Sequence, residues 1–194
     1  MGQMMVWQRS PLPTPLLNLS RPLHKDAVRM FRAVQRLMGD SERGATAGSN
    51  TPRLEEARWL LGEGLANGEL RDELYCQVMK QLTNNPNSYV TLSYTIFVSD
   101  VTSFLCREST FRGWQLLCVL LVTFPPSKNF EPYLHAFLSQ HTGITQGRID
   151  VLAKHCLKRL AAIAKKGPRG KPPSLAEIET ASVRSLFPFV SIRR

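Results

Sequence analysis

Several features that mark enzymes and cofactor sites are missing from this chain of 194 residues. No glycine-rich phosphate loop follows a strand pattern, and no zinc-protease helix or nucleophile elbow is present. The histidines are scattered over predicted helices, where a structural role is the ordinary interpretation. They are His24, His135, His141 and His155. We therefore expect a protein that is not an enzyme and that uses no cofactor, metal or small-molecule substrate.

Cysteine is also scarce, and its spacing fits neither a zinc site nor an obvious disulfide framework. The four cysteines are Cys76, Cys106, Cys118 and Cys156. Three of them lie in apolar helical patterns, so we expect reduced core thiols in a cytoplasmic protein. The N-terminus has no apolar signal core, because Trp7, Gln8 and Arg9 interrupt it. Val6 likewise breaks the myristoylation pattern that begins at Gly2.

Acidic residues are outnumbered, with 15 Asp and Glu against 25 Lys and Arg and a net charge of +10. The imbalance is strongest between Arg148 and Lys171, where Asp150 is the one acidic residue among eight basic ones. Such a surface favours an acidic partner over a basic one. The alternative is a basic surface that only binds water. Aromatic residues fall in helical apolar stripes, so core packing is favoured over base stacking, and we expect no nucleic-acid partner.

Hydrophobic residues make up 43% of the chain, enough for one buried core with tails. Between Leu70 and Asn87, large apolar residues recur every four positions, which predicts a helix with one buried stripe. The polar residues of this stretch fall on its other face, and Pro86 in the Asn-rich turn ends it. The apolar stripe is Leu70, Leu74, Val78 and Leu82; the polar face is Arg71, Asp72, Glu73, Gln77, Lys80 and Gln81.

The stretch from Arg112 to His141 begins with Gly113-Trp114 and continues with residues that are apolar on every side, so it predicts a central buried helix. Pro125-Pro126 ends this helix, and Ser127 or Asn129 can cap the next one. The next helix carries an apolar stripe at three-and-four spacing. Its members are Phe130, Tyr133, Leu134, Phe137 and Leu138.

Three further helices are expected over residues 24–38, 52–65 and 149–164, and Gly39 supplies the left-handed residue that ends the first. Residues 41–51 predict a surface loop. Ser174 and Glu177 form a capping box that starts a short helix reaching about Ser182. Prolines at positions 11, 13 and 15 predict an extended N-terminal arm. Alone this arm could be an SH3 ligand, but such a segment before a helix more often packs on the domain.

Four segments together are similar to one known family: LRDE followed by a hydrophobic residue and YCQ, then QLTNNPN, RGWQLL and FPPS-x-x-F-x-x-Y-L. They resemble the myosin-tail homology 4 (MyTH4) domain, found in unconventional myosin tails, a plant kinesin and some Rho GTPase-activating proteins. The resemblance implies an all-α, compact multi-helix bundle. The signature residues are Leu70, Arg71, Asp72, Glu73, Tyr75, Pro86, Arg112, Gly113, Trp114, Pro125, Pro126, Phe130 and Tyr133.

We expect an arm over residues 1–23, a helical domain over 24–166, and a basic, proline-rich linker and tail over 167–194. Residues 88–111 depart from the family, which joins its Asn-Pro-Asn turn to Arg-Gly-Trp within a few residues. Residues 89–107 are rich in strand-favouring types. They are a translated intron, a genuine insertion, or a membrane-inserting segment. The last is disfavoured, because a spanning helix needs about 20 mostly apolar residues.

The resemblance implies a non-catalytic module that binds the cytoskeleton, notably the acidic surface of tubulin, in the cytoplasm. We expect the basic helix to make that contact through Lys154, Lys158, Arg159, Lys165 and Lys166. The alternative is peripheral attachment to acidic lipid through the same helix. Neither a FERM domain nor a GTPase-activating domain follows in this chain. We therefore expect the targeting part of a Rho GTPase-activating protein, in a longer or truncated gene product.

Overall fold

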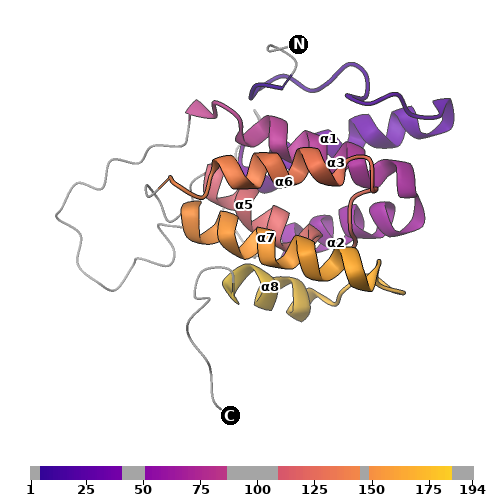
Figure 1. Cartoon of the computed structure of the whole chain (residues 1–194). Coiled ribbons are helices and arrows are strands. Elements are labelled where there is room, and N and C mark those ends of the chain that lie inside the picture. The colour runs from indigo at the N-terminus through magenta and orange to yellow at the C-terminus, as the bar shows by residue number, and fades with distance from the viewer. Residues whose placement is uncertain (1–4, 41–50, 87–108, 145–148, 185–194) are drawn as a thin grey trace.

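Each predicted helix is present in the computed structural model, which describes residues 5–40, 51–86, 109–144 and 149–184 (Figure 1). Within those ranges the chain forms seven α-helices, one 3-10 turn and no strand, so the predicted all-α bundle is confirmed. The predicted loop over 41–51 lies outside these ranges except for Thr51, and so do residues 88–108 of the insertion. The elements are η1 (Arg21–Leu23), α1 (His24–Met38), α2 (Thr51–Ala66), α3 (Gly68–Leu82), α5 (Ser109–Leu120), α6 (Glu131–Gln140), α7 (Ile149–Lys166) and α8 (Leu175–Arg184).

Helix α5 is the centre of the bundle, as its uniformly apolar sequence predicted. It packs against α1, α3, α7 and α8, while α6 packs against α7 and α2 against α1, α3 and α8. Every residue of α5 from Leu116 to Leu120 is buried. Burying a helix that is apolar on every side removes few polar groups from water. Such a helix therefore occupies the core, and the amphipathic helices cover it.

The helix ends follow from local chemistry. Gly39 has a φ of +85°, and its amide donates to the Arg36 and Gln35 carbonyls, which ends α1 where the sequence predicted. Gly167 has a φ of +80° and ends α7 in the same way. At the start of α8, the Glu177 amide donates to Ser174 Oγ at 3.2 Å and the Ser174 amide donates to Glu177 Oε2 at 2.8 Å. The predicted capping box is therefore confirmed.

The polar side of α3 does not face solvent, although its sequence predicted an apolar stripe on one face only. Glu73, Gln77, Lys80 and Gln81 are all buried. Glu73, Lys80 and Gln81 hydrogen-bond to backbone groups of the N-terminal arm, which lies over them. Gln77 Nε2 instead donates to the Ala27 carbonyl of α1 at 2.9 Å and to Glu73 Oε1 at 2.8 Å. An extended arm has no helical or sheet partner for its amides and carbonyls, so this row of polar side chains satisfies them.

The arm itself is extended and tied to the bundle along its length, which confirms its predicted packing. The Trp7 amide donates to the Thr83 carbonyl at 2.9 Å, and Trp7 Nε1 donates to Asp40 Oδ2 at 3.0 Å. Gln8 exchanges two hydrogen bonds with the Gln81 side chain. Figure 1 shows the arm along the α1 and α3 side of the molecule, with α8 along the opposite side.

Two predicted segment boundaries differ from the structure. Residues 109–111, assigned to the insertion, form the first turn of α5 and are buried. Part of the segment 167–194, expected to be a linker and tail, packs on the bundle, because Pro173 and Ile178 are buried and α8 contacts α2 and α5. The Arg169 amide also donates to the Thr123 carbonyl at 2.8 Å. The division of the chain into domains otherwise stays a prediction.

The capping box gives α8 a pH-dependent stability. The Arg169 side chain, then the Ser174 amide, lower the pKa of Glu177 from 4.5 to about 2. A carboxylate with a lowered folded pKa stabilises the fold above the unfolded pKa, and the effect is lost as the pH falls from about 4.5 towards about 2. We expect Glu177→Gln to lower the melting temperature at pH 7 and to have a much smaller effect at pH 2. A difference at pH 2 as large as that at pH 7 would show that the ionised carboxylate is not the cause.

Candidate functional site

The candidate site is the outward side of α7, where the sequence predicted a basic face. Successive residues of an α-helix are rotated by about 100°. The apolar residues of α7 fall on one side and are buried against α5 and α6, namely Leu152, Ala153, Cys156, Leu160 and Ile163. The basic residues occupy a neighbouring arc. All five that were predicted are exposed: Lys154, Lys158, Arg159, Lys165 and Lys166.

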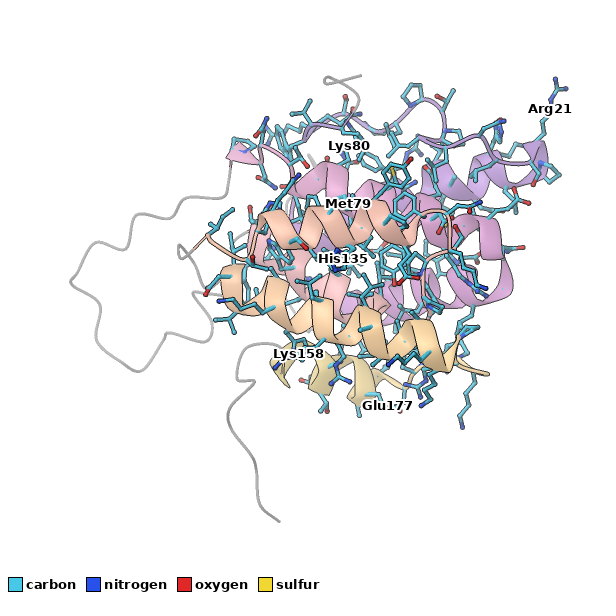
Figure 2. All side chains as sticks on the ribbon, viewed as in Figure 1. Arg21, Met79, Lys80, His135, Lys158 and Glu177 are labelled. Carbon is cyan, nitrogen blue, oxygen red and sulfur yellow. The ribbon has the colours of Figure 1, made fainter. Side chains whose placement is uncertain are left out.

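These five cations are not equally available. Lys154 Nζ pairs with Asp150 Oδ2 at 3.3 Å, one turn earlier on the same helix. Arg159 Nε donates to His155 Nε2 at 3.4 Å, a long hydrogen bond. Lys158, Lys165 and Lys166 form no ion pair within the described ranges, so they carry the unneutralised charge of this face. Figure 2 shows Lys158 on the α7 and α8 side of the molecule.

His155 does not add a positive charge to this face near neutral pH. Burial lowers the pKa of His155 below 6.5, and the adjacent positive charges of Arg159 and Lys158 lower it further. A neutral imidazole can accept the hydrogen bond from Arg159, which agrees with the geometry.

A hollow of about 330 Å³ lies beside this face, between α5, α7 and α8. Val122 and Cys118 contribute its apolar lining, and Arg159, Arg169 and Glu177 contribute charge. Arg169 pairs with Glu177 at 2.8 Å. Arg169 is therefore largely neutralised, and Arg159 is the cation that links the hollow to the basic face.

The Leu-Arg-Asp-Glu part of the signature makes structural contacts. Arg71 donates from Nε to the Gly64 carbonyl at 2.7 Å and joins α3 to the end of α2. Asp72 Oδ1 accepts from the Ser127 amide at 2.8 Å, which fixes the turn after the two prolines. The buried Tyr75 hydroxyl donates to the Phe124 carbonyl at 2.7 Å. These residues hold the connections of the bundle together.

The Arg-Gly-Trp part sets the packing of α5. Arg112 Nη1 donates to the Met38 carbonyl at the end of α1 at 3.4 Å. A Cβ on Gly113 would lie 2.7 Å from both Leu82 and Met38 side chains, so this glycine permits close approach of three helices. Trp114 is buried and lies against Phe137 and His141 of the α6 region, at ring-centroid distances of 5.9 and 5.2 Å.

The other signature residues differ in burial. Leu70 and Pro126 are buried, Pro125 and Phe130 are partly buried, and Pro86 is exposed in the turn. Tyr133 is 69% exposed, so its predicted place in the apolar stripe of α6 is wrong. Leu134, Phe137 and Leu138 face the core and fix the orientation of the helix, which turns Tyr133 outwards.

The three described cysteines are free and buried, in agreement with reduced core thiols. Cys118 Sγ and Cys156 Sγ nevertheless lie 3.4 Å apart across the α5–α7 contact, a proximity that their sequence spacing did not reveal. Burial raises the pKa of Cys156 well above its usual value and that of Cys76 to about 12. Both thiols are therefore protonated and unreactive near neutral pH. Cys106 lies outside the described ranges.

The described residues bring together no group of three metal-binding side chains. The histidines stay apart and make local contacts: His24 with the Leu19 carbonyl and His141 with the Phe137 carbonyl. His135 and Ser139 are 3.5 Å apart, one turn apart on the exposed side of α6. Such a long, solvent-exposed contact without a third orienting group offers little nucleophilic activation.

A second basic stripe was missed by sequence reasoning. Lys25, Arg29, Arg32 and Arg36 follow at intervals of four, three and four residues, and all are exposed on α1. That spacing is visible in the sequence and places the four on one helix face.

Comparison with known proteins identifies the family. The model described as the MyTH4 domain matches residues 57–180, which is more than half of the chain. The chain belongs to the MyTH4 domain family. The match includes α7 and most of α8, so the basic face lies within this MyTH4 domain.

Relatives of this MyTH4 domain include motor proteins of the cytoskeleton. A kinesin-like protein, KIN-14E of Arabidopsis thaliana, is 30% identical over 179 residues, covering 91% of this chain and 13% of the kinesin. Myosin-VIIa of Drosophila melanogaster is 34% identical over 129 residues, covering 66% of this chain and 5% of the myosin. The chain thus spans a small fraction of these relatives.

A solved structure shares the fold. The human myosin 7b C-terminal MyTH4-FERM domain, determined in complex with the harmonin-a PDZ3 domain, is 31% identical to this chain, with a TM-score of 0.72. The likeness covers 92% of this chain and 32% of that one. Within the described ranges, this MyTH4 domain has no helix that is both long and apolar enough to cross a membrane.

Proposed function

We propose that this MyTH4 domain is a non-catalytic module that binds the cytoskeleton by docking α7 on the acidic surface of tubulin. The observation that carries the proposal is the face formed by Lys154, Lys158, Arg159, Lys165 and Lys166, exposed on a helix whose other side is buried. The kinship with kinesin and myosin tails supports a cytoskeletal setting. In this proposal the protein acts in the cytoplasm and associates with the cytoskeleton.

Electrostatics determines what such a face does. Exposed lysines attract a carboxylate-rich surface over a range of about 8–10 Å at physiological salt. They mainly increase the rate of encounter and select against basic partners. Since three of the five cations have no intramolecular ion pair within the described ranges, little attraction is lost inside the protein.

Charge reversal tests the α7 face. We expect Lys158→Glu, Arg159→Glu, Lys165→Glu and Lys166→Glu together to weaken microtubule co-sedimentation at low salt by at least about tenfold, which is about 1.4 kcal/mol. The matched control reverses Arg21, Lys25, Arg29 and Arg32 on the α1 side, which changes the net charge equally. Equal losses in both variants would show that net charge alone, and not α7, controls binding.

An anionic membrane surface is the alternative partner, because the same lysines would attract acidic lipid. The exposed positions between them on α7 are alanines, namely Ala161, Ala162 and Ala164. These small residues offer little apolar area for insertion, so tubulin is the preferred partner. Flotation with acidic liposomes in the absence of tubulin distinguishes the two. If the α7 charge-reversal variant lost binding to liposomes but still co-sedimented with microtubules, the membrane would be favoured as the partner of this face.

We further propose that the domain is the targeting part of a Rho GTPase-activating protein whose catalytic domain lies elsewhere in the gene. The sequence resemblance to such proteins motivates this proposal, whereas the relatives named above are motor proteins. Downstream coding sequence tests it: an in-frame helical domain with a presented arginine would support it. A motor domain or a FERM domain in the same frame would contradict it.

A further inference from the structure

A second groove lies away from α7, between the N-terminal arm and α1. It has a volume of about 310 Å³. The arm contributes residues 13–15 to one wall, and α1 contributes Lys25, Val28, Arg29 and Arg32 to the other. His24 also lines the groove and is held by a 3.0 Å contact with the Leu19 carbonyl. No acidic side chain is among the described residues that line the groove.

The charged wall of the groove is exposed and partly fixed in place. Lys25, Arg29 and Arg32 are all exposed. The Arg29 guanidinium lies 4.4 Å from the ring centroid of Trp59, a cation–π contact that orients it without neutralising it. Arg36, the next member of the same stripe, is bound to Glu56 and does not line the groove.

The opposite wall is rigid for two reasons. Prolines at positions 13 and 15 fix their own φ angles and restrict the residues before them. Immediately after them, the amides of Leu16 and Leu17 donate to the buried Glu73 carboxylate at 2.8–3.1 Å. The Ser20 amide donates to Glu69 at 3.0 Å. A preformed wall lowers the entropy lost when a ligand binds.

We propose that this groove binds an acidic, extended peptide segment of a protein partner, with apolar side chains between two carboxylates. Lys25 and Arg32 are seven residues apart, which is about 10.5 Å along a helix. A chain in the extended polyproline II conformation has three residues per turn and rises about 9.3 Å over them, so side chains at i and i+3 lie on the same side. Carboxylates at positions i and i+3 of the segment therefore meet Lys25 and Arg32. The apolar side chains between them contact Val28 and the proline wall.

A phosphorylated lipid headgroup fits the groove less well. Its phosphates are compact and need cations that converge on one point, whereas these cations are spread along two turns of α1. The apolar strip formed by Pro13, Pro15 and Val28 would also remain uncovered by such a ligand. The spread of charge and the apolar strip together favour a peptide.

The groove is distinct from the proposed tubulin-binding face. Figure 2 shows Arg21, the first residue of η1, projecting at the far side of the molecule from Lys158 on α7. The inference therefore does not rest on the proposed function. Either one can fail while the other stands.

The test uses two fluorescein-labelled peptides of identical composition. The first, Ser-Glu-Val-Leu-Glu-Ser, has its acids three residues apart, and the second, Glu-Glu-Ser-Val-Leu-Ser, has them adjacent. We expect fluorescence anisotropy at low salt to show at least about fivefold tighter binding of the first peptide. Lys25→Gln with Arg32→Gln should weaken the first peptide at least about tenfold. Lys128→Gln with Lys171→Gln, which removes the same charge at two exposed positions outside both proposed sites, should change it less than about twofold.

Three results would overturn the inference. Equal affinity for both peptides would show that the protein attracts acidic peptides by charge alone, without a groove that reads their spacing. Equal losses of peptide affinity in both double variants would show that the net charge of the protein determines binding. The α1 variant, Lys25→Gln with Arg32→Gln, could lose binding to vesicles that contain a phosphoinositide while its peptide binding stays unchanged. That result would assign the groove to lipid. Circular dichroism of each variant tests whether the exposed substitutions leave the fold intact. With the fold intact, a loss of binding is attributed to the groove.

Discussion

Trp114→Ala is expected to lower the free energy of unfolding by about 3–5 kcal/mol. Trp114 is 1% exposed, at the point where α5 meets the α6 region, and its ring lies against Phe137 and His141. Removing the indole leaves a cavity inside a tightly packed helix contact, because Gly113 holds α5 close to α1 and α3 and limits relaxation. Denaturant titration of both proteins measures the difference.

Tyr133→Ala is the matched control, because it truncates another aromatic residue of the family signature. Tyr133 is 69% exposed, so its truncation should change the free energy of unfolding by less than about 0.5 kcal/mol. A loss at Tyr133 as large as that at Trp114 would contradict the orientation of α6. Together the two variants separate residues that mark the family from residues that stabilise it.

Glu73→Ala is expected to release the N-terminal arm and to lower the free energy of unfolding by about 2–4 kcal/mol, since hydrogen bonds to charged groups contribute about 1.5–3 kcal/mol each. The Glu73 side chain is fully buried. Its carboxylate accepts from the Leu16 and Leu17 amides and from Gln77 Nε2 at 2.8 Å. Limited proteolysis should then cut within residues 8–20 much faster than in the wild type, and denaturant titration measures the stability.

Glu69→Ala provides the comparison, because Glu69 also accepts hydrogen bonds from the arm, at Ser20, but in an exposed position. Exposed polar contacts exchange with water, so the loss should be below about 1 kcal/mol. If Glu73→Ala left the arm as resistant to proteolysis as Glu69→Ala does, the buried carboxylate would not be what holds the arm.

The sequence predicted the helices well where the apolar spacing and the capping residues indicated the same boundaries. Helix α1 has an apolar stripe followed by Gly39, and its end is where the glycine placed it. Helix α8 begins at the capping box of Ser174 and Glu177. In both cases the information is local, because a cap or a left-handed glycine acts within a few residues of itself.

What the sequence did not predict depends on contacts between distant segments. Glu73 and Gln81 read as solvent-facing residues of α3, and only the arm, more than 50 residues earlier in the chain, explains their burial. Tyr133 matched the apolar spacing of α6, yet the packing of Leu134 and Phe137 turned it outwards. Cys118 and Cys156 became neighbours only through the α5–α7 contact.

The candidate site was predicted in part. All five basic residues assigned to α7 are exposed, as a partner-binding role requires, but their role in binding stays a prediction. The α1 stripe was missed. The origin of residues 89–107 also stays a prediction, and sequencing of transcripts tests it: a pool in which every transcript carries these residues would contradict a retained intron.

The most direct test of the account compares the microtubule affinity of three proteins at 50 and 200 mM salt. They are the wild type, the α7 variant reversed at Lys158, Arg159, Lys165 and Lys166, and the α1 variant reversed at Arg21, Lys25, Arg29 and Arg32. We expect salt-sensitive binding that is lost in the α7 variant and retained in the α1 variant. Binding by the α7 variant that matches the wild type at low salt would contradict it.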